Sequence, residues 1–413
     1  MLRPTGRLFR AIHRGSGFMR KSDANTVLSG VNSRRMSRRA VIGGTVGLIA
    51  ASRFSPTFAQ AATSIAPTGL TAQSVYSFDS TANVLLYSLE PDKRLAIGSL
   101  VKVTTALVVV NTITDLNEQV LIDASDTVDI TQESNMQLVA GDTLTVSLLL
   151  YGLLIPSGND GANALARYVG SKISGSDDPA VARAAFVDRM NSFVKEQGLV
   201  DSQFQTPNGL DARDQFSTAH DVAKLFGLLM QNEKLRSIVS EAAYQGTSSG
   251  PEKRPYTSPT TNKLLGQFGV IGGKTGTTEE AGSCVVLARE VEGGNVVIIS
   301  VVGANIEYTP EGMQVEESDT RWDDASAVIA QMDETITWIA PPDETAFPGL
   351  EDEMNVWQVE TKEQAAVPLR VGDDKSLYQL VLGAPVSAGE AAGKVDLFYG
   401  EIQLGSFPVY QAG

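Results

Sequence analysis

Residues 95–109 read LAIGSLVKVTTALVV, an apolar segment in which Ser99 and Lys102 stand three positions apart. The spacing of its apolar residues predicts a helix, and residues three apart share one face of a helix. A lysine amine that faces a hydroxyl can accept its proton when the amine is neutral. Burial favours that form, because desolvation lowers the pKa of a lysine. We therefore expect Ser99 to be a nucleophile and Lys102 its general base.

A Ser-x-x-Lys pattern carries little weight alone, since composition predicts about one chance occurrence in a chain of this length. A second copy does occur, from Ser192 to Lys195, in a segment whose amphipathic period predicts an ordinary helix surface. Two further motifs distinguish the first copy. A Ser-Gly-Asn turn at 157–159 follows a strongly apolar segment, and a Lys-Thr-Gly motif occupies 274–276.

Residues 1–61 have the pattern of a leader. Two arginines, Arg38 and Arg39, precede an apolar run over 41–51, and the sequence Ala-Gln-Ala at 59–61 offers a small-residue cleavage site. This pattern predicts a twin-arginine export signal that is removed, so we expect a periplasmic, extracellular or wall-associated protein. The apolar run is short for a membrane span. Either Met1 or Met36 can be the true start.

Acidic residues outnumber basic residues in the rest of the chain. The 413 residues include 33 Lys and Arg against 48 Asp and Glu, and the leader holds 11 of the bases but one acid. The remainder therefore carries a net charge near −25. Such a surface argues against nucleic acid and against an anionic membrane as partners.

Two scarce residue types limit the chemistry. Cys284 is the sole cysteine, which excludes an internal disulfide, and we expect it to be a small core residue. His220 is the one histidine beyond the leader, so a zinc site of His and Cys is nearly excluded, and we expect neither metal nor cofactor. A Ser-His-Asp triad would need His220, which stands at a capped helix start and which we expect to be structural.

The patterns along the chain predict an α/β (α+β) protein. An apolar alternation predicts a hairpin, a helical period predicts helices, and a run of three strands around Lys274 predicts a meander. The hairpin is expected at 74–78 and 83–88, the helices at 146–155, 162–169, 181–197, 221–230 and 322–339, and the two partner strands of the meander at 284–288 and 295–302. We expect one domain over 62–340, in which helices flank an antiparallel sheet. Pro341-Pro342 then marks a boundary, and 341–413 predicts a small acidic β-rich domain.

The three motifs, in this order, resemble the penicilloyl-serine transferase superfamily, which comprises penicillin-binding proteins and serine β-lactamases. The segments LLIPSGNDGANAL (153–165), PNGLD (207–211) and TNKLL (261–265) resemble the serine D-alanyl-D-alanine carboxypeptidases in particular. The resemblance covers about residues 68–340. It implies that 62–340 is a catalytic domain of β-lactamase/transpeptidase-like fold with a helical subdomain. It also implies an exported, penicillin-binding enzyme that removes the terminal D-alanine from peptidoglycan stem peptides. Peptides ending in D-Ala-D-Ala would be substrates, and β-lactams covalent inhibitors.

The resemblance also implies a role for each motif residue. Ser99 would form the acyl-enzyme, Lys102 would accept its proton, and Ser157 would relay a proton to the leaving amine. Asn159 would bond the substrate amide. The Lys-Thr-Gly strand would bind the carboxylate through Lys274 and Thr275, keep the site cationic, and approach the substrate at Gly276; the backbone amides of Ser99 and Thr277 would form the oxyanion hole.

Several positions depart from the family pattern. Val101 stands where a threonine usually precedes the active lysine. Carboxypeptidases of this kind often use an arginine about 35 residues past Lys-Thr-Gly, but no base lies between Arg289 and Arg321, so we assign none. We also find no amphipathic anchor near the C-terminus and expect no membrane anchor after leader removal.

Two other functions remain open. A serine β-lactamase shares all three motifs, but it often carries a Glu-x-x-Leu-Asn loop that activates water, and the chain lacks that string. A catalytically silent muropeptide-binding protein is the second alternative, suggested by Val101 and the acidic surface.

Overall fold

The computed structural model describes residues 67, 69–250, 252–310, 312, 314–343, 345–362, 366–370, 376–383, 386–399 and 402–413. The leader expected at 1–61 lies outside these residues. The described chain up to residue 340, together with 366–370, forms one compact unit, and the other described residues from 341 onward form a second.

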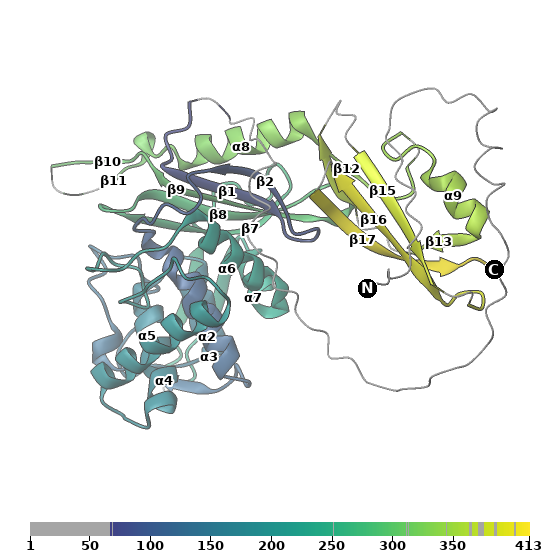
Figure 1. Cartoon of the computed structure of the whole chain (residues 1–413). Helices are drawn as coiled ribbons and strands as arrows, with labels where there is room; N and C mark the ends of the chain where they lie inside the picture. The colour runs from purple at the N-terminus through teal and green to yellow at the C-terminus, as the bar shows by residue number, and fades with distance from the viewer. Residues whose placement is uncertain are drawn as a thin grey trace, which may run out of the picture. The chain divides into compact units, whose positions relative to one another are not determined.

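The first unit is built on a five-stranded antiparallel sheet (Figure 1). Its strand order is β2-β1-β9-β8-β7, with bounds β1 Ser74–Asp79, β2 Val84–Leu89, β7 Val270–Thr278, β8 Gly282–Glu290 and β9 Val296–Ala304. The predicted hairpin and meander are confirmed. Both faces are buried: in β8, Val285 and Leu287 join one core cluster, while Val286 and Ala288 join the other. This is the period-two alternation of a strand between two layers.

Helices cover the two faces of this sheet (Figure 1). Helix α8, Arg321–Thr335, packs on one face, and α2, Val101–Thr112, lies in the core cluster of the opposite face with α6, Ala219–Gln231. The 3₁₀ turn η3, Gly98–Leu100, leads directly into α2. The face that carries α2 is therefore the face on which Ser99 and Lys102 lie.

The helical subdomain packs in the same core cluster as α2 and α6. Its helices are α3 Val146–Leu154, α4 Asn159–Ser174 and α5 Pro179–Glu196, and α7 Glu233–Val239 follows α6. Capping residues set where two of these helices begin. The Asp178 carboxylate accepts hydrogen bonds from the backbone amides of residues 180 and 181, and Pro179 is the first residue of α5. The Thr218 hydroxyl caps α6 in the same way. The predicted helices at 146–155, 162–169, 181–197 and 221–230 are confirmed within a few residues, whereas α7 was not predicted.

Short elements connect these layers. They are β3 Gln119–Leu121, η4 Ala124–Asp126, β4 Thr143–Thr145, β5 Ala243–Thr247, β6 Pro255–Pro259, η5 Glu292–Gly294, β10 Glu307–Tyr308, β11 Gln314–Val315 and η6 Glu316–Ser318. Strands β3 and β4 pair, as do β5 and β6 and also β10 and β11. The buried Asp126 carboxylate binds Arg167 and Arg183, each at 2.7 Å, and so ties η4 to α4 and α5.

The helix predicted over 322–339 is wrong in its last four residues. Helix α8 ends at Thr335, and Ile336–Ile339 forms strand β12, which pairs with β14, Val367–Arg370. Three of these four residues are β-branched and the fourth is Trp338, a composition that favours a strand. The indole Nε1 of Trp338 donates to Asp79 Oδ2 at 2.9 Å, which fixes β12 beside β1.

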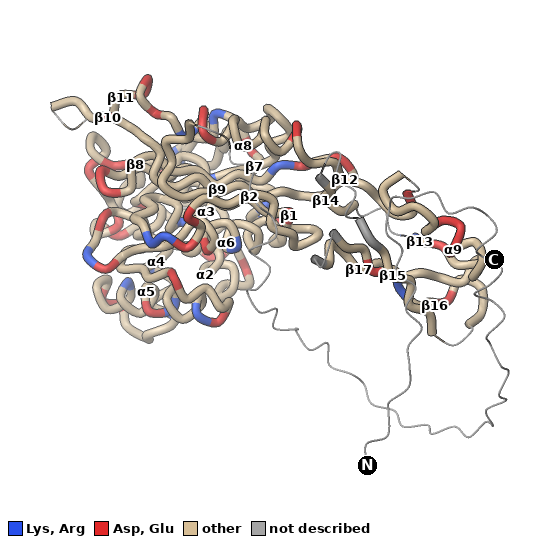
Figure 2. The backbone as a smooth tube through the Cα atoms, turned by 45° about the horizontal axis from the view of Figure 1, so that its top comes forward, with Lys and Arg blue, Asp and Glu red and all other residues tan. Residues whose placement is uncertain are grey.

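The second unit contains a four-stranded antiparallel sheet, as the predicted β-rich region implies. The order is β13-β17-β16-β15, with bounds β13 Val359–Thr361, β15 Ser376–Leu382, β16 Ala391–Tyr399 and β17 Ile402–Gln411. It also contains a helix that was not expected, α9, Leu350–Trp357. Its first turn carries Glu351, Asp352 and Glu353, which complement the positive end of the helix dipole (Figure 2).

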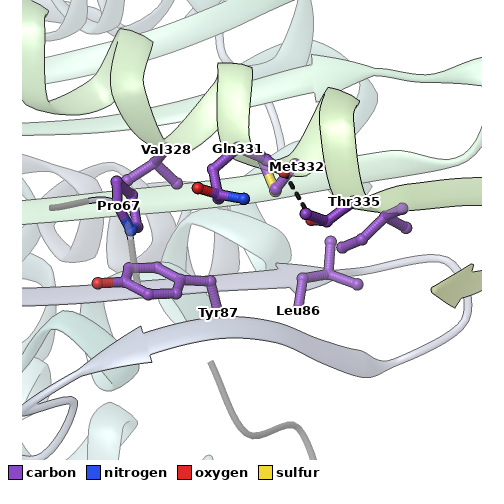
Figure 3. Close-up of a pocket in the computed structure, with 8 residues that line it drawn as sticks. Pro67, Leu86, Tyr87, Val328, Gln331, Met332 and Thr335 are labelled. Carbon is purple, nitrogen blue, oxygen red and sulfur yellow. Dashed lines mark hydrogen bonds between the residues drawn. The ribbon is translucent and has the colours of Figure 1, made fainter. Parts of the chain in front are cut away.

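A small gap lies between β2 and α8, on the side of the sheet away from α2. Figure 3 shows it lined by Leu86, Tyr87, Val328 and Met332, with Thr335 hydrogen-bonded along the helix. Its volume is about 20 Å³, little more than one water molecule needs. The gap is therefore a packing defect and not a ligand site.

Two features are absent from the described residues. None of their helices is long and apolar enough to cross a membrane. No group of three or more of their His, Cys, Asp and Glu side chains is arranged to hold a metal ion.

Candidate active site

Ser99 and Lys102 face each other at the junction of η3 and α2. Ser99 lies in the 3₁₀ turn, where side chains three residues apart are nearly eclipsed, and Lys102 lies in the first turn of the α-helix. Ser99 Oγ is 2.7 Å from Lys102 Nζ. Gly98 enters the turn with φ of +53°, a conformation that favours glycine. The expected pairing is therefore present, although Ser99 precedes the α-helix proper.

Three oxygen atoms surround the Lys102 amine. Besides Ser99 Oγ, Asn159 Oδ1 and the backbone carbonyl oxygen of Asn208 each lie 2.6 Å from Nζ. The two carbonyl oxygens can only accept hydrogen bonds, whereas the hydroxyl can donate or accept. A neutral amine, which has two N–H groups and one lone pair, satisfies this set with its lone pair directed at the Ser99 hydroxyl. In this arrangement the amine is within hydrogen-bond reach of the hydroxyl proton, as a general base requires.

Burial prepares Lys102 for this role. Its side chain is fully buried, and desolvation lowers its pKa to about 7, while the nearby carboxylates of Asp160 and Glu133 act in the opposite direction. A substantial fraction of the amine is therefore neutral at neutral pH. An ordinary lysine, with a pKa near 10.4, would leave less than about one part in a thousand unprotonated.

A second serine and lysine form another pair. Ser157, at the turn between α3 and α4, has φ of +67°, a strained conformation of the sort found at functional sites. Its Oγ accepts from Lys274 Nζ at 2.7 Å, and Lys274 also donates to the backbone oxygen of Thr275. Burial, together with the positive charges of Lys102 and Arg321, holds the pKa of Lys274 well below its usual range.

Strand β7 lies directly against the Ser99 turn. A Cβ added at Gly276 would stand 2.5 Å from the Ile97 carbonyl oxygen and 3.1 Å from the Ser99 amide nitrogen. A Cβ at Gly98 would stand 2.9 Å from the Thr277 amide nitrogen. Glycine at these two positions lets the backbones meet, and it brings the amides of Ser99 and Thr277 into the same small region.

The structure brings the remaining motif residues to the same place. The Ser-Gly-Asn turn supplies Asn159, which contacts Lys102, and the Thr275 hydroxyl lies 2.7 Å from that of Thr261 in the TNKLL segment. Val101, in place of the usual threonine, is fully buried in the core cluster. All three motifs thus converge at η3, the start of α4 and strand β7.

Other candidate groups lie elsewhere. His220 contacts Asp221 at 3.2 Å and the ring of Tyr76, in keeping with the structural role predicted for it. The second Ser-x-x-Lys copy is exposed on α5, where the Ser192 hydroxyl donates to the backbone of Asp188. Cys284 is fully buried, as expected.

Three residues of the site were not predicted from the sequence. The first is Asn208, whose carbonyl oxygen contacts Lys102; it lies in the PNGLD segment, which resembles the family but has no role predicted from the sequence. Arg321 lies later than the spacing considered for the missing arginine, yet it is buried and donates to the Gly276 carbonyl oxygen at 2.9 Å and to the Thr277 hydroxyl. It is the sole base between residues 290 and 340, which is a signal the sequence did contain. Glu133 Oε2 accepts from Asn159 Nδ2 at 2.7 Å, and no motif marks it.

A serine hydroxyl 2.7 Å from a buried lysine amine, with a second serine–lysine pair whose lysine lies on strand β7, is the arrangement of an acyl-transferring serine enzyme of the penicilloyl-serine transferase class. Comparison with known proteins identifies the family within that class. The D-alanyl-D-alanine carboxypeptidase family profile matches residues 60–306, and the chain belongs to this family.

Individual relatives agree with the family. The chain is 35% identical over 280 residues to a D-alanyl-D-alanine carboxypeptidase of Streptomyces sp. (strain K15), covering 65% of this chain and 93% of the relative. It is 28% identical over 368 residues to the carboxypeptidase DacC of Escherichia coli, covering 83% and 84%. The crystal structure of the Streptomyces K15 DD-transpeptidase matches with a TM-score of 0.57 at 31% identity, covering 63% of this chain and 97% of that one.

Proposed function

We propose that the chain is an exported serine D-Ala-D-Ala carboxypeptidase that trims the terminal D-alanine from peptidoglycan stem peptides. The observation that carries the proposal is the environment of Lys102, a buried amine 2.7 Å from Ser99 Oγ and within 2.6 Å of two carbonyl oxygens. Export rests on the twin-arginine pattern of the leader, and binding of β-lactams rests on the family.

Acylation is the first step. Lys102 Nζ takes the Ser99 hydroxyl proton as Oγ bonds to the carbonyl carbon between the two D-alanines. The backbone amides of Ser99 and Thr277 stabilise the resulting oxyanion, and each such donor is worth about 3 kcal/mol of barrier. The carbon–nitrogen bond then breaks, and the proton that Lys102 took reaches the departing D-alanine amine through the Ser157 hydroxyl, which gives one proton and receives one. Water then attacks the ester carbonyl carbon and gives a proton to Lys102, the bond to Ser99 Oγ breaks, and the proton returns to Oγ as the shortened peptide leaves.

Strand β7 and α4 bind the substrate. We infer that the terminal carboxylate lies against Lys274 and Thr275. Its negative charge opposes the depression of the Lys274 pKa, so a bound substrate favours the ammonium form. The Asn159 carboxamide bonds the substrate backbone, and the Cβ missing at Gly276 keeps β7 close to the Ser99 turn.

Release of D-alanine from diacetyl-Lys-D-Ala-D-Ala tests the proposal, with Ser99→Ala as the matched variant. We expect release by the wild type and none by the variant. Ser192→Ala, in the exposed second copy of the motif, is the control and should be fully active. Equal release by the Ser99→Ala variant would refute the nucleophile.

The alternatives give different results. Steady, fast hydrolysis of nitrocefin identifies a β-lactamase, whereas a stable stoichiometric adduct identifies a carboxypeptidase. A silent muropeptide-binding protein fails to label at Ser99 with fluorescent penicillin. The Streptomyces K15 relative of known structure is named a DD-transpeptidase, and transfer shares the acyl-enzyme but ends on an amine. Adding a glycine-type amine acceptor to the assay therefore separates transfer from hydrolysis.

A further inference from the structure

One carboxylate outside the three motifs reaches the catalytic side chains. We propose that Glu133 is a positioning residue that locks the carboxamide of Asn159 in one orientation and thereby holds Lys102 against Ser99. The inference rests on the function proposed above, since it concerns the base of that reaction.

The loop that carries Glu133 is fastened to the start of α4. The Asp160 carboxylate accepts the amides of Met136 and Leu138, each at 2.9 Å, and the Asn159 amide donates to the Ser134 oxygen at 2.8 Å. The Glu133 amide closes a turn onto the Asp129 oxygen. Glu133 is therefore held by the same helix start that presents Asn159.

The directions of two hydrogen bonds fix the orientation of the Asn159 side-chain carboxamide. Asn159 Oδ1 accepts from Lys102 at 2.6 Å, and Asn159 Nδ2 donates to Glu133 Oε2 at 2.7 Å. An ionised carboxylate can only accept, and the neutral Lys102 amine faces Asn159 with an N–H group, because its lone pair is directed at Ser99. Rotating the amide by half a turn would oppose two donors at Lys102 and two acceptors at Glu133. The second N–H of Nδ2 stays available for a substrate carbonyl.

Glu133 also contributes charge. The charged groups that act on Lys102 are Glu133 from the loop and Asp160 from α4, and Lys102 itself lowers the pKa of Lys274 on β7. Both carboxylates raise the pKa of Lys102 against the larger effect of burial. Removing the charge of Glu133 while keeping an acceptor should therefore make Lys102 a weaker base that is neutral at lower pH.

Two substitutions separate these effects. Glu133→Gln keeps an oxygen that can accept from Asn159 and removes the charge, whereas Glu133→Ala removes both. The control is Glu292→Gln, which neutralises an exposed carboxylate on the β8–β9 hairpin. For each purified protein we would measure kcat/KM for D-alanine release against pH, the thermal midpoint, and the titration of Lys102 Nζ by ¹⁵N NMR.

We expect Glu133→Gln to move the acidic limb of the profile to lower pH by about half a unit to one unit, with its plateau retained. Glu133→Ala should show the same displacement and lose about tenfold to a hundredfold in plateau rate, because Asn159 is free to rotate. Glu292→Gln should match the wild type. A limb that stays in place in Glu133→Gln, or a full plateau in Glu133→Ala, would overturn the inference.

The NMR titration separates this inference from the function. If the wild type releases no D-alanine while the Lys102 titration still moves to lower pH in Glu133→Gln, the carboxypeptidase proposal fails and the coupling of Glu133 to Lys102 stands. If D-alanine is released and neither the titration nor the profile moves, the carboxypeptidase proposal stands and the coupling of Glu133 to Lys102 fails.

Discussion

Replacing Gly276 by alanine tests how the Ser99 turn is placed against β7. The added Cβ would lie 2.5 Å from the Ile97 carbonyl oxygen, 3.0 Å from the Leu100 amide nitrogen and 3.1 Å from the Ser99 amide nitrogen. Carbon approaches a carbonyl oxygen no closer than about 3.3 Å. All three clashing atoms belong to backbone, so no side chain can swing away, and the turn must separate from β7 by roughly 0.8 Å.

The consequence falls on the geometry between the two elements. Ser99 and Lys102 lie on one continuous turn, so their 2.7 Å contact should survive. The Ser99 amide, however, moves away from Thr277, and a displacement near 1 Å can cost about a hundredfold in rate. Overpacking of this kind costs about 1–3 kcal/mol of stability.

The assay is the second-order rate of acylation by fluorescent penicillin, measured against pH and accompanied by the thermal midpoint. We expect a loss of about a hundredfold, with the acidic limb of the pH profile unmoved. Gly250→Ala is the matched control, because a Cβ there meets nothing closer than 3.9 Å. Acylation of the Gly276→Ala variant at the wild-type rate would refute the packing argument. A limb that moves would show that the serine–lysine contact had also been lost.

Three further predictions follow from buried charges. If Lys102 is the general base, as proposed, its pKa, lowered to about 7 by burial, predicts an acylation rate that falls tenfold per pH unit well below that value and levels off above it; a profile that is flat across pH 7 contradicts this. Arg321→Ala should lower the free energy of unfolding in urea by about 3 kcal/mol, because it takes the buried guanidinium away from the largely covered Asp319 carboxylate and from the β7 backbone, and a loss under 1 kcal/mol would count against the role of Arg321 in fixing β7. Asp126→Ala should lower the free energy of unfolding by a similar amount, because it removes the ion pairs with Arg167 and Arg183 that join η4 to α4 and α5. An unchanged urea midpoint would show that these ion pairs do not stabilise the fold.

The sequence alone determined the features that depend on neighbours along the chain. The spacing of Ser99 and Lys102 within an apolar segment predicted that they share a face, and their contact follows from one helical turn. Alternation predicted the β1–β2 hairpin and the meander of β7, β8 and β9. The shortage of histidine and cysteine directed attention to lysine as the base, and the three ordered motifs indicated the family.

The tertiary structure decided everything that depends on contacts between distant segments. The composition of 336–339 favours a strand, but only the fold shows that its partner is β14, which follows Pro341-Pro342 in the chain. Arg321 reaches β7 from α8, and the Asn208 carbonyl reaches Lys102 from a loop 106 residues away. A backbone carbonyl carries no mark in the sequence, because every residue has one, and only folding selects which of them meets a buried amine.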